Sequence, residues 1–374
     1  MADNKKHLLW LSLVKAVAMI CMVFGHTFQS GNFQAYLHSW ASPATFFMSG
    51  VMFSTMNKSF SGFAKNKART LLVPYLIFGF LSIVIYSLLG VFVKDALADQ
   101  RVIEGGFFDQ VLRLLSGTCA ANTPIWFLPC LFIVMLLSFP IGKLTDKFKK
   151  RSSKAIIISS FILLSVLWGF LNNLVFDIHY LPFNFDAALH MIAFFLLGYL
   201  LTQSGATEYM SKLKSIPSLI LGVCIMGAGA YFASLNISAS GGFFKIRMLG
   251  SVYGNMWAAC PATFLGIIGF VFICMSVKKS KVLDYIGKHT LSILVMHKFP
   301  IVFYQGLCIP VLKKLTSGLA QNYIDIILLA AGLAAVVLGV ALPLLAELII
   351  DKIFPPALGK KFPKKLETAQ TKSA

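Results

Sequence analysis

Charged residues are scarce in this sequence, and acidic residues are the scarcest of all. Lys, Arg, Asp and Glu make up 13% of the 374 residues, with 33 basic side chains against 14 acidic ones. An ordinary soluble domain carries roughly a quarter charged residues. So few charges cannot cover a water-facing surface. The composition therefore excludes an ordinary soluble protein and predicts that lipid covers most of the chain.

Several motifs that would indicate other chemistry are also missing. The sequence has no GxSxG, no HExxH and no phosphate-binding P-loop. Its seven cysteines form no CxxC pair, and most lie within apolar runs, where cysteine acts as a small hydrophobic residue. These absences disfavour a serine hydrolase, a zinc protease, a nucleotide-driven pump and a disulfide framework. No bound metal is expected.

Long apolar runs recur along the chain, and a membrane-spanning helix needs about 20 such residues. The sequence predicts an all-α, polytopic transmembrane helix bundle of about ten spans, with residues 1–351 as one integral-membrane domain and 352–374 as a basic tail. The predicted loop 94–123 is expected to hold a short amphipathic segment. The runs are Leu8–Phe28, His38–Met56, Leu71–Val93, Pro124–Pro140, Ala155–Leu171, Ala187–Thr202, Ile216–Ser234, Val252–Ser276, Thr290–Ile309 and Ile324–Ile350.

Basic residues between these runs predict the topology. Most of the 33 lysines and arginines fall in alternate loops, for example 143–154 and 278–288. Cytoplasmic loops carry such an excess. We therefore expect both termini in the cytoplasm. The net charge of +19 follows this pattern and predicts no nucleic-acid partner.

Two ionisable side chains within the first run are candidate functional residues. Lys15 and His26 are eleven positions apart, which places them on one face of a helix, about 16 Å apart along its axis. Charges inside spans are costly and often functional. A histidine is suited to removing a hydroxyl proton because its pKa lies near neutrality. The alternative is that Lys15 snorkels to the interface and His26 is an interfacial histidine.

Other polar residues fall at a similar predicted depth near the outer face. His38 opens the second run, while Asp186 and His190 lie one helical turn apart at the sixth. Asn255 lies near the outer end of the eighth run and His297 near the middle of the ninth. Taken singly, each suits packing or hydrogen bonding. The depth that the outer residues share with His26 favours a functional role, in which Asp186 orients the histidine.

Six segments, in order, resemble the membrane-bound acyltransferase-3 family, particularly its fucose 4-O-acetylase-like branch. The first is a basic residue, ten intervening residues and then Gly-His, matched by Lys15 and Gly25-His26. The family usually has arginine where this chain has Lys15, and lysine loses the bidentate fork of arginine. The other segments are PATFFMSG at 43–50, KNKARTLLVPY at 65–75, PIWFLPCLF at 124–132, FDAALHMIAFFLLGYL at 185–200 and IGKHTLSILVMHKFPI at 286–301.

The resemblance implies ten spans, an acyl-CoA donor in the cytoplasm and a sugar or polysaccharide acceptor outside. Acetyl-CoA is the family's usual donor, and succinyl is possible. His26 would act as general base, or accept the acyl group transiently. The implied catalytic residues are His26, Lys15 and Asp186; the donor-binding residues are Lys65, Lys67, Arg69 and His297; the sugar-binding residues are Trp126, His190 and Asn255.

Two other functions stay open from the residues alone. Buried charges in a multi-span protein also suit an exporter or flippase of polysaccharide or lipid-linked sugar. A non-catalytic membrane partner of a glycan-synthesis complex is the third possibility. An acyltransferase consumes acyl-CoA and a carrier does not, whereas a non-catalytic partner tolerates the loss of His26. In each case we expect a multi-pass protein of the bacterial inner membrane.

Overall fold

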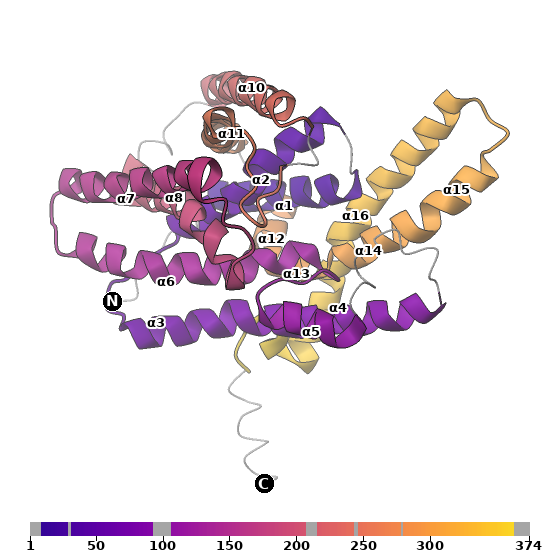
Figure 1. Ribbon diagram of the computed structural model, residues 1–374, viewed down its shortest axis with the longest axis horizontal. Coiled ribbons are helices and arrows are strands. Elements are labelled where there is room, and N and C mark those ends of the chain that lie inside the picture. The colour runs from indigo at the N-terminus through magenta and orange to yellow at the C-terminus, as the bar shows by residue number, and fades with distance from the viewer. Residues whose placement is uncertain are drawn as a thin grey trace, which may run out of the picture. The chain divides into compact units, whose positions relative to one another are not determined.

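The computed structural model describes residues 9–28, 31–92, 106–206, 215–242, 246–277 and 280–362. Every named element in these residues is a helix, which confirms the predicted all-α bundle (Figure 1). The chain forms two compact units. Unit 1 comprises Met1–Asn57 and Ile133–Thr290, and unit 2 comprises Lys58–Phe132 and Leu291–Ala374.

Unit 1 is built from pairs of helices in close contact. The pairs are α10 with α11, α2 with α8, α7 with α8, and α1 with both α2 and α12. Glycines allow the closest approach, because a Cβ atom at Gly50 of α2 would collide with the Phe195 carbonyl of α8. The helices are α1 (Leu9–Thr27), α2 (Asn32–Val51), most of α6 (Phe127–Asp146), α7 (Arg151–Leu171), α8 (Phe185–Gln203), α10 (Ser215–Ala239), α11 (Met256–Ser276) and α12 (Lys281–Lys288).

Unit 2 begins with one continuous helical segment. Ser59 caps it, because its Oγ accepts a hydrogen bond from the Gly62 N–H at 3.2 Å. The unit comprises α3 (Phe60–Lys67), the π-helix η1 (Ala68–Leu72), α4 (Val73–Phe92), α5 (Gly106–Leu115), η3 (Thr123–Trp126), α13 (Thr290–Met296), α14 (Lys298–Phe303), η7 (Tyr304–Cys308), α15 (Ile309–Leu315), α16 (Gln321–Ile353) and η8 (Pro355–Leu358).

The amphipathic segment expected in loop 94–123 is α5, although residues 93–105 lie outside the described part. Leu114 of α5 is buried against α4, where the Tyr75 hydroxyl donates to the Leu114 carbonyl at 2.7 Å. On the opposite face Phe108 is 82% exposed. This arrangement confirms the expected segment.

Nine helical segments of the described chain are long and apolar enough to cross a membrane. Helix α2 is not among them, but its 20 residues span about 30 Å, which is the thickness of the hydrocarbon core. Helix α2 corresponds to the second of the ten predicted runs, and among the described helices it has the length of a span but not the hydropathy of the other nine.

The bounds of α2 differ from the predicted run His38–Met56. The helix begins at Asn32 and ends at Val51, so His38 lies in its second turn and does not open it. Polar residues in the first turns, including Gln34, conceal this start from a hydropathy pattern. The shift places His38 level with the C-terminal end of α1.

The C-terminal segment returns to the start of unit 2. Gly359 follows η8 with a φ of +68°, and a Cβ atom there would lie 2.7 Å from the Thr70 Cα of η1. The predicted tail 352–374 therefore begins with packed structure, and residues 363–374 of it lie outside the described part. All seven cysteines are free thiols.

Candidate active site

His26 lies in the last turn of α1, where its ring meets that of His38 from α2. The two ring centroids are 5.5 Å apart and the planes make an angle of 73°. Both side chains are half-buried, which leaves them within reach of a ligand while holding them in place. A histidine so placed can accept a proton from an incoming hydroxyl.

Gly25 allows this approach between the two helices. A Cβ atom on residue 25 would lie 2.7 Å from the His38 Nε2, closer than any real packing contact. Gln34, one turn before His38 on α2, donates from Nε2 to the Gly25 carbonyl at 2.6 Å and lies 3.4 Å from the His38 Nε2. The glycine of the Gly-His pair thus makes room for His38.

Lys15 faces α2 from three turns earlier on α1. Its ammonium donates to the Met52 sulfur at 3.1 Å, just beyond the end of α2. Lys15 thus contacts the residue that follows α2 and His26 contacts α2 itself, in agreement with the single helix face inferred from their spacing. This face carries a cation at one level and an imidazole about 16 Å further along.

Asp186 does not make the expected contact with His26. Its carboxylate is fully buried at the start of α8, where Oδ1 accepts from the Leu181 N–H at 3.1 Å and Oδ2 from the Ser251 hydroxyl at 2.8 Å. These bonds tie the 3₁₀ helix η5 (Pro182–Asn184) and residue 251 to α8. In the described chain Asp186 thus organises the start of α8, and the ring beside His26 is His38.

His190 and Asn255 make structural contacts within unit 1. His190 is 3% exposed, and its Nδ1 lies 3.4 Å from the Ser165 carbonyl of α7. Asn255 is exposed and caps α11, because its side chain accepts from the Trp257 N–H at 3.0 Å. Neither residue is positioned beside His26 by a contact in the described chain.

The expected donor-binding lysines and arginine lie on a helix and not on a loop. Lys65 is exposed on α3, and Lys67 lies over the Phe63 ring at 5.7 Å. Arg69 is in the π-helix η1, where its guanidinium donates to the Asn66 side chain at 2.7 Å. Their ammonium and guanidinium groups are suited to phosphate oxygens.

The remaining expected site residues, Trp126 and His297, belong to unit 2 and are buried. His297 is fully buried, with Nδ1 2.8 Å from the Ile293 carbonyl one turn earlier. Trp126 is 9% exposed in η3. The neighbouring Lys298 donates to the Thr123 hydroxyl at 3.3 Å. These contacts hold His297 and Lys298 at the break between α13 and α14.

Sequence reasoning missed Gln34 as a member of the site and did not pair His38 with His26. The only signal was the i, i+4 spacing of these two polar residues within an otherwise packed helix. No group of three or more His, Cys, Asp or Glu side chains that could hold a metal ion lies in the described residues. The structure brings together His26, His38, Gln34 and the backbone of Gly25.

Nearly the whole chain is similar to one protein family. An acyltransferase-domain model matches residues 8–347, nearly the whole chain. No curated protein and no solved structure matches this chain. The matched region includes α1, with His26, and every other candidate site residue. The chain is a multi-pass membrane protein and belongs to the acyltransferase-3 family.

Proposed function

We propose that this acyltransferase moves an acyl group, in the simplest case acetyl, from cytoplasmic acyl-CoA to a hydroxyl of an extracytoplasmic sugar or surface polysaccharide. Its location would be the bacterial inner membrane. The family supports acyl transfer in general. The observation that carries the proposal is the half-buried imidazole of His26, held against α2 at the end of a membrane-spanning helix.

The chemistry requires a base at the acceptor hydroxyl. His26 accepts the hydroxyl proton as the sugar oxygen attacks the thioester carbonyl of acyl-CoA. The carbon–sulfur bond then breaks, an ester forms, and the CoA thiolate leaves and takes up the proton from His26. General base catalysis of this kind contributes about 10²–10⁴-fold to a rate.

The donor requires positive charge for its phosphates. Lys65, Lys67 and Arg69 supply three cationic groups within about one helical turn, where α3 continues into η1. Charge-assisted hydrogen bonds to phosphate are about twice as strong as neutral ones. Lys15 offers a point charge on the same face as His26, which suits a single carbonyl or phosphate oxygen and not a bidentate contact.

Release of CoA from acetyl-CoA by the purified protein in vesicles tests the proposal, with crude cell-envelope glycan as acceptor. Comparing the native chain with His26→Gln isolates the imidazole, because glutamine keeps polarity but cannot accept the proton. We expect the variant to lose about 10²-fold or more of the native rate.

The matched control is His289→Gln, which changes a histidine that packs on Tyr285 at the end of α12. It should release CoA at the native rate. If neither the native chain nor the control consumes acetyl-CoA, the acetyl version of the proposal fails. Equal rates for native and His26→Gln would remove His26 from the mechanism.

A further inference from the structure

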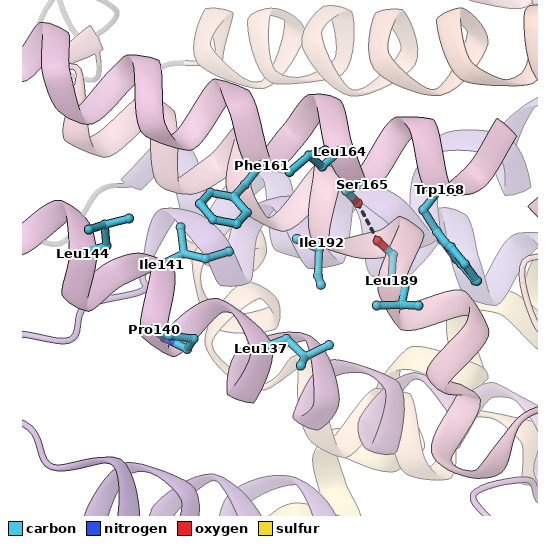
Figure 2. Close-up of a pocket in the computed structure, with 10 residues that line it drawn as sticks. All are labelled: Leu137, Pro140, Ile141, Leu144, Phe161, Leu164, Ser165, Trp168, Leu189 and Ile192. Atoms are coloured by element: carbon cyan, nitrogen blue, oxygen red, sulfur yellow. Dashed lines mark hydrogen bonds between the residues drawn. The ribbon is translucent and has the colours of Figure 1, made fainter. Parts of the chain in front are cut away.

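An apolar groove runs between α6, α7 and α8 in unit 1. Its volume is about 430 Å³, and Figure 2 shows side chains of the three helices around it. Leu137, Ile141 and Leu144 line it from α6. Phe161, Leu164 and Trp168 line it from α7. All three helices are among those long and apolar enough to cross a membrane, so we expect a groove between them to face lipid.

The polar groups at the groove are already satisfied by the protein. The Ser165 hydroxyl donates to the Leu189 carbonyl at 2.5 Å (Figure 2). The Trp168 indole N–H donates to the Asp186 carbonyl at 3.3 Å. Since neither group is available to a ligand, the groove suits a hydrocarbon chain and not a sugar or a peptide.

Strong positive charge lies at one end of this groove. Leu144 is two residues from the end of α6, and α7 begins at Arg151 after a short turn. The one acidic residue of this stretch, Asp146, accepts a hydrogen bond from the Thr55 hydroxyl at 2.6 Å. The basic turn, as we call it, comprises Lys143, Lys147, Lys149, Lys150, Arg151 and Lys154.

We infer that the groove and the basic turn together form a binding site for an anionic phospholipid of the bilayer. One acyl chain lies in the groove, and the phosphate of the headgroup lies at the basic turn. The positive-inside pattern alone explains the charges but not the groove. Contact with bulk lipid alone would fill the groove, but it would give no preference for an anionic lipid over a neutral one. This inference is independent of the acyl-transfer reaction.

Quenching of Trp168 by brominated lipid tests the site directly, because this indole lines the groove. The full-length protein is reconstituted in phosphatidylcholine vesicles that contain a fixed fraction of lipid with brominated chains. That lipid is either phosphatidylglycerol or phosphatidylcholine. Subtracting the quenching measured for Trp168→Phe isolates Trp168 from the other four tryptophans. We expect Trp168 to be quenched at a lower fraction of the anionic lipid than of the neutral one.

The headgroup preference should depend on the basic turn. Attraction to an anionic surface gives about a fivefold preference for each lysine that the headgroup reaches. The triple variant Lys147→Gln/Lys149→Gln/Lys150→Gln should therefore lose most of it. The matched control Lys281→Gln/Lys313→Gln/Lys314→Gln removes the same charge from α12 and α15 and should keep it.

The groove is tested by a second matched pair. Leu164→Phe adds bulk to a lining residue and should reduce the quenching of Trp168 by either lipid. Leu163→Phe makes the same change at a neighbouring exposed residue outside the lining and should not. Equal quenching by the two lipids in the native protein would overturn the inference. So would a preference that survives in the Lys147/Lys149/Lys150 variant.

Discussion

At the residue scale, the candidate active site is centred on two imidazoles, those of His26 on α1 and His38 on α2, which lie in contact. The shared face of Lys15 and His26 follows from helix geometry and could be predicted from their spacing. The contact between His26 and His38 could not be, because it depends on where α2 begins and on the missing side chain at Gly25. The hydrogen bonds of Asp186 and Asn255 could not be predicted either. Ser251, which donates to Asp186, lies 65 residues further along the chain, and a sequence pattern does not show that Asn255 caps α11.

Gly25→Ala tests the pairing of the two histidines. The new methyl group would lie 2.7 Å from the His38 Nε2 and must displace that ring or α1 itself. A displacement of about 1 Å near the reacting group can cost about 10²-fold in rate. We expect kcat for CoA release to fall by about this factor, with little change in the KM for acyl-CoA.

Gly227→Ala is the matched control, because a Cβ atom there meets nothing within 4 Å. Alanine is the better helix former, so this control should keep native kcat and thermal stability. A Gly25→Ala protein with native kcat would show that the approach of His38 is irrelevant to the reaction.

Asn255 offers a test of capping against sugar binding. Loss of an N-cap costs about 1 kcal/mol, whereas serine retains the cap. Asn255→Ala should therefore lower the unfolding temperature and Asn255→Ser should not, with native acceptor KM for both. Equal stability of the two variants, together with a raised acceptor KM, would restore the sugar-binding role.

At the element scale, most helices could be predicted because long apolar runs have few alternatives in a membrane. The predicted helix bounds are wrong where polar residues continue a helix beyond its apolar run. The basic segment with Lys65 and Lys67 was expected in a loop, yet it forms α3 and continues through η1 into α4. The return of η8 onto η1 was not predicted, because the close contact at Gly359 is tertiary and leaves no periodic signal.

Lys360 ties this C-terminal return to α16. Its ammonium bonds to Glu347 and to Asp351, at 2.6 Å in each case. Burial alone would lower the pKa of Lys360, but hydrogen bonds to the two carboxylates and their charges outweigh it and hold the pKa above its ordinary value of 10.5. A raised lysine pKa gives stability that is fully present below the unfolded-state pKa and is lost as the pH rises through the folded-state value.

The difference in unfolding temperature between the native chain and Lys360→Met should accordingly be constant from neutral pH to about pH 10 and shrink at higher pH. Thermal unfolding at several alkaline pH values measures it. Lys361→Met, at an exposed neighbour, should show little difference at any pH. A difference that grows with pH would contradict the assigned ion pairs.

At the scale of the whole molecule, composition and charge distribution predicted an all-helical membrane protein, and the helices and the family agree. The division into two compact units was not foreseen, because each unit joins segments far apart in the sequence. A hydropathy pattern shows neighbours along the chain but not which distant segments pack together.

The predicted orientation of the chain is testable by cysteine labelling in intact cells. In a background without the native cysteines, Lys313→Cys on α15 should react with a membrane-impermeant maleimide, whereas Lys149→Cys in the turn before α7 should react only after lysis. Both positions are exposed in the described chain. The reverse pattern would place both termini outside and contradict the topology.

The most direct test of the central claim follows the acyl group itself. Vesicles with the purified protein would receive acetyl-CoA labelled in the acetyl group, and cell-envelope glycan would be recovered and treated with mild alkali. We expect alkali-labile label on the glycan with the native chain and His289→Gln, and almost none with His26→Gln. Label that reaches the glycan equally well without the His26 imidazole would contradict its role as the general base.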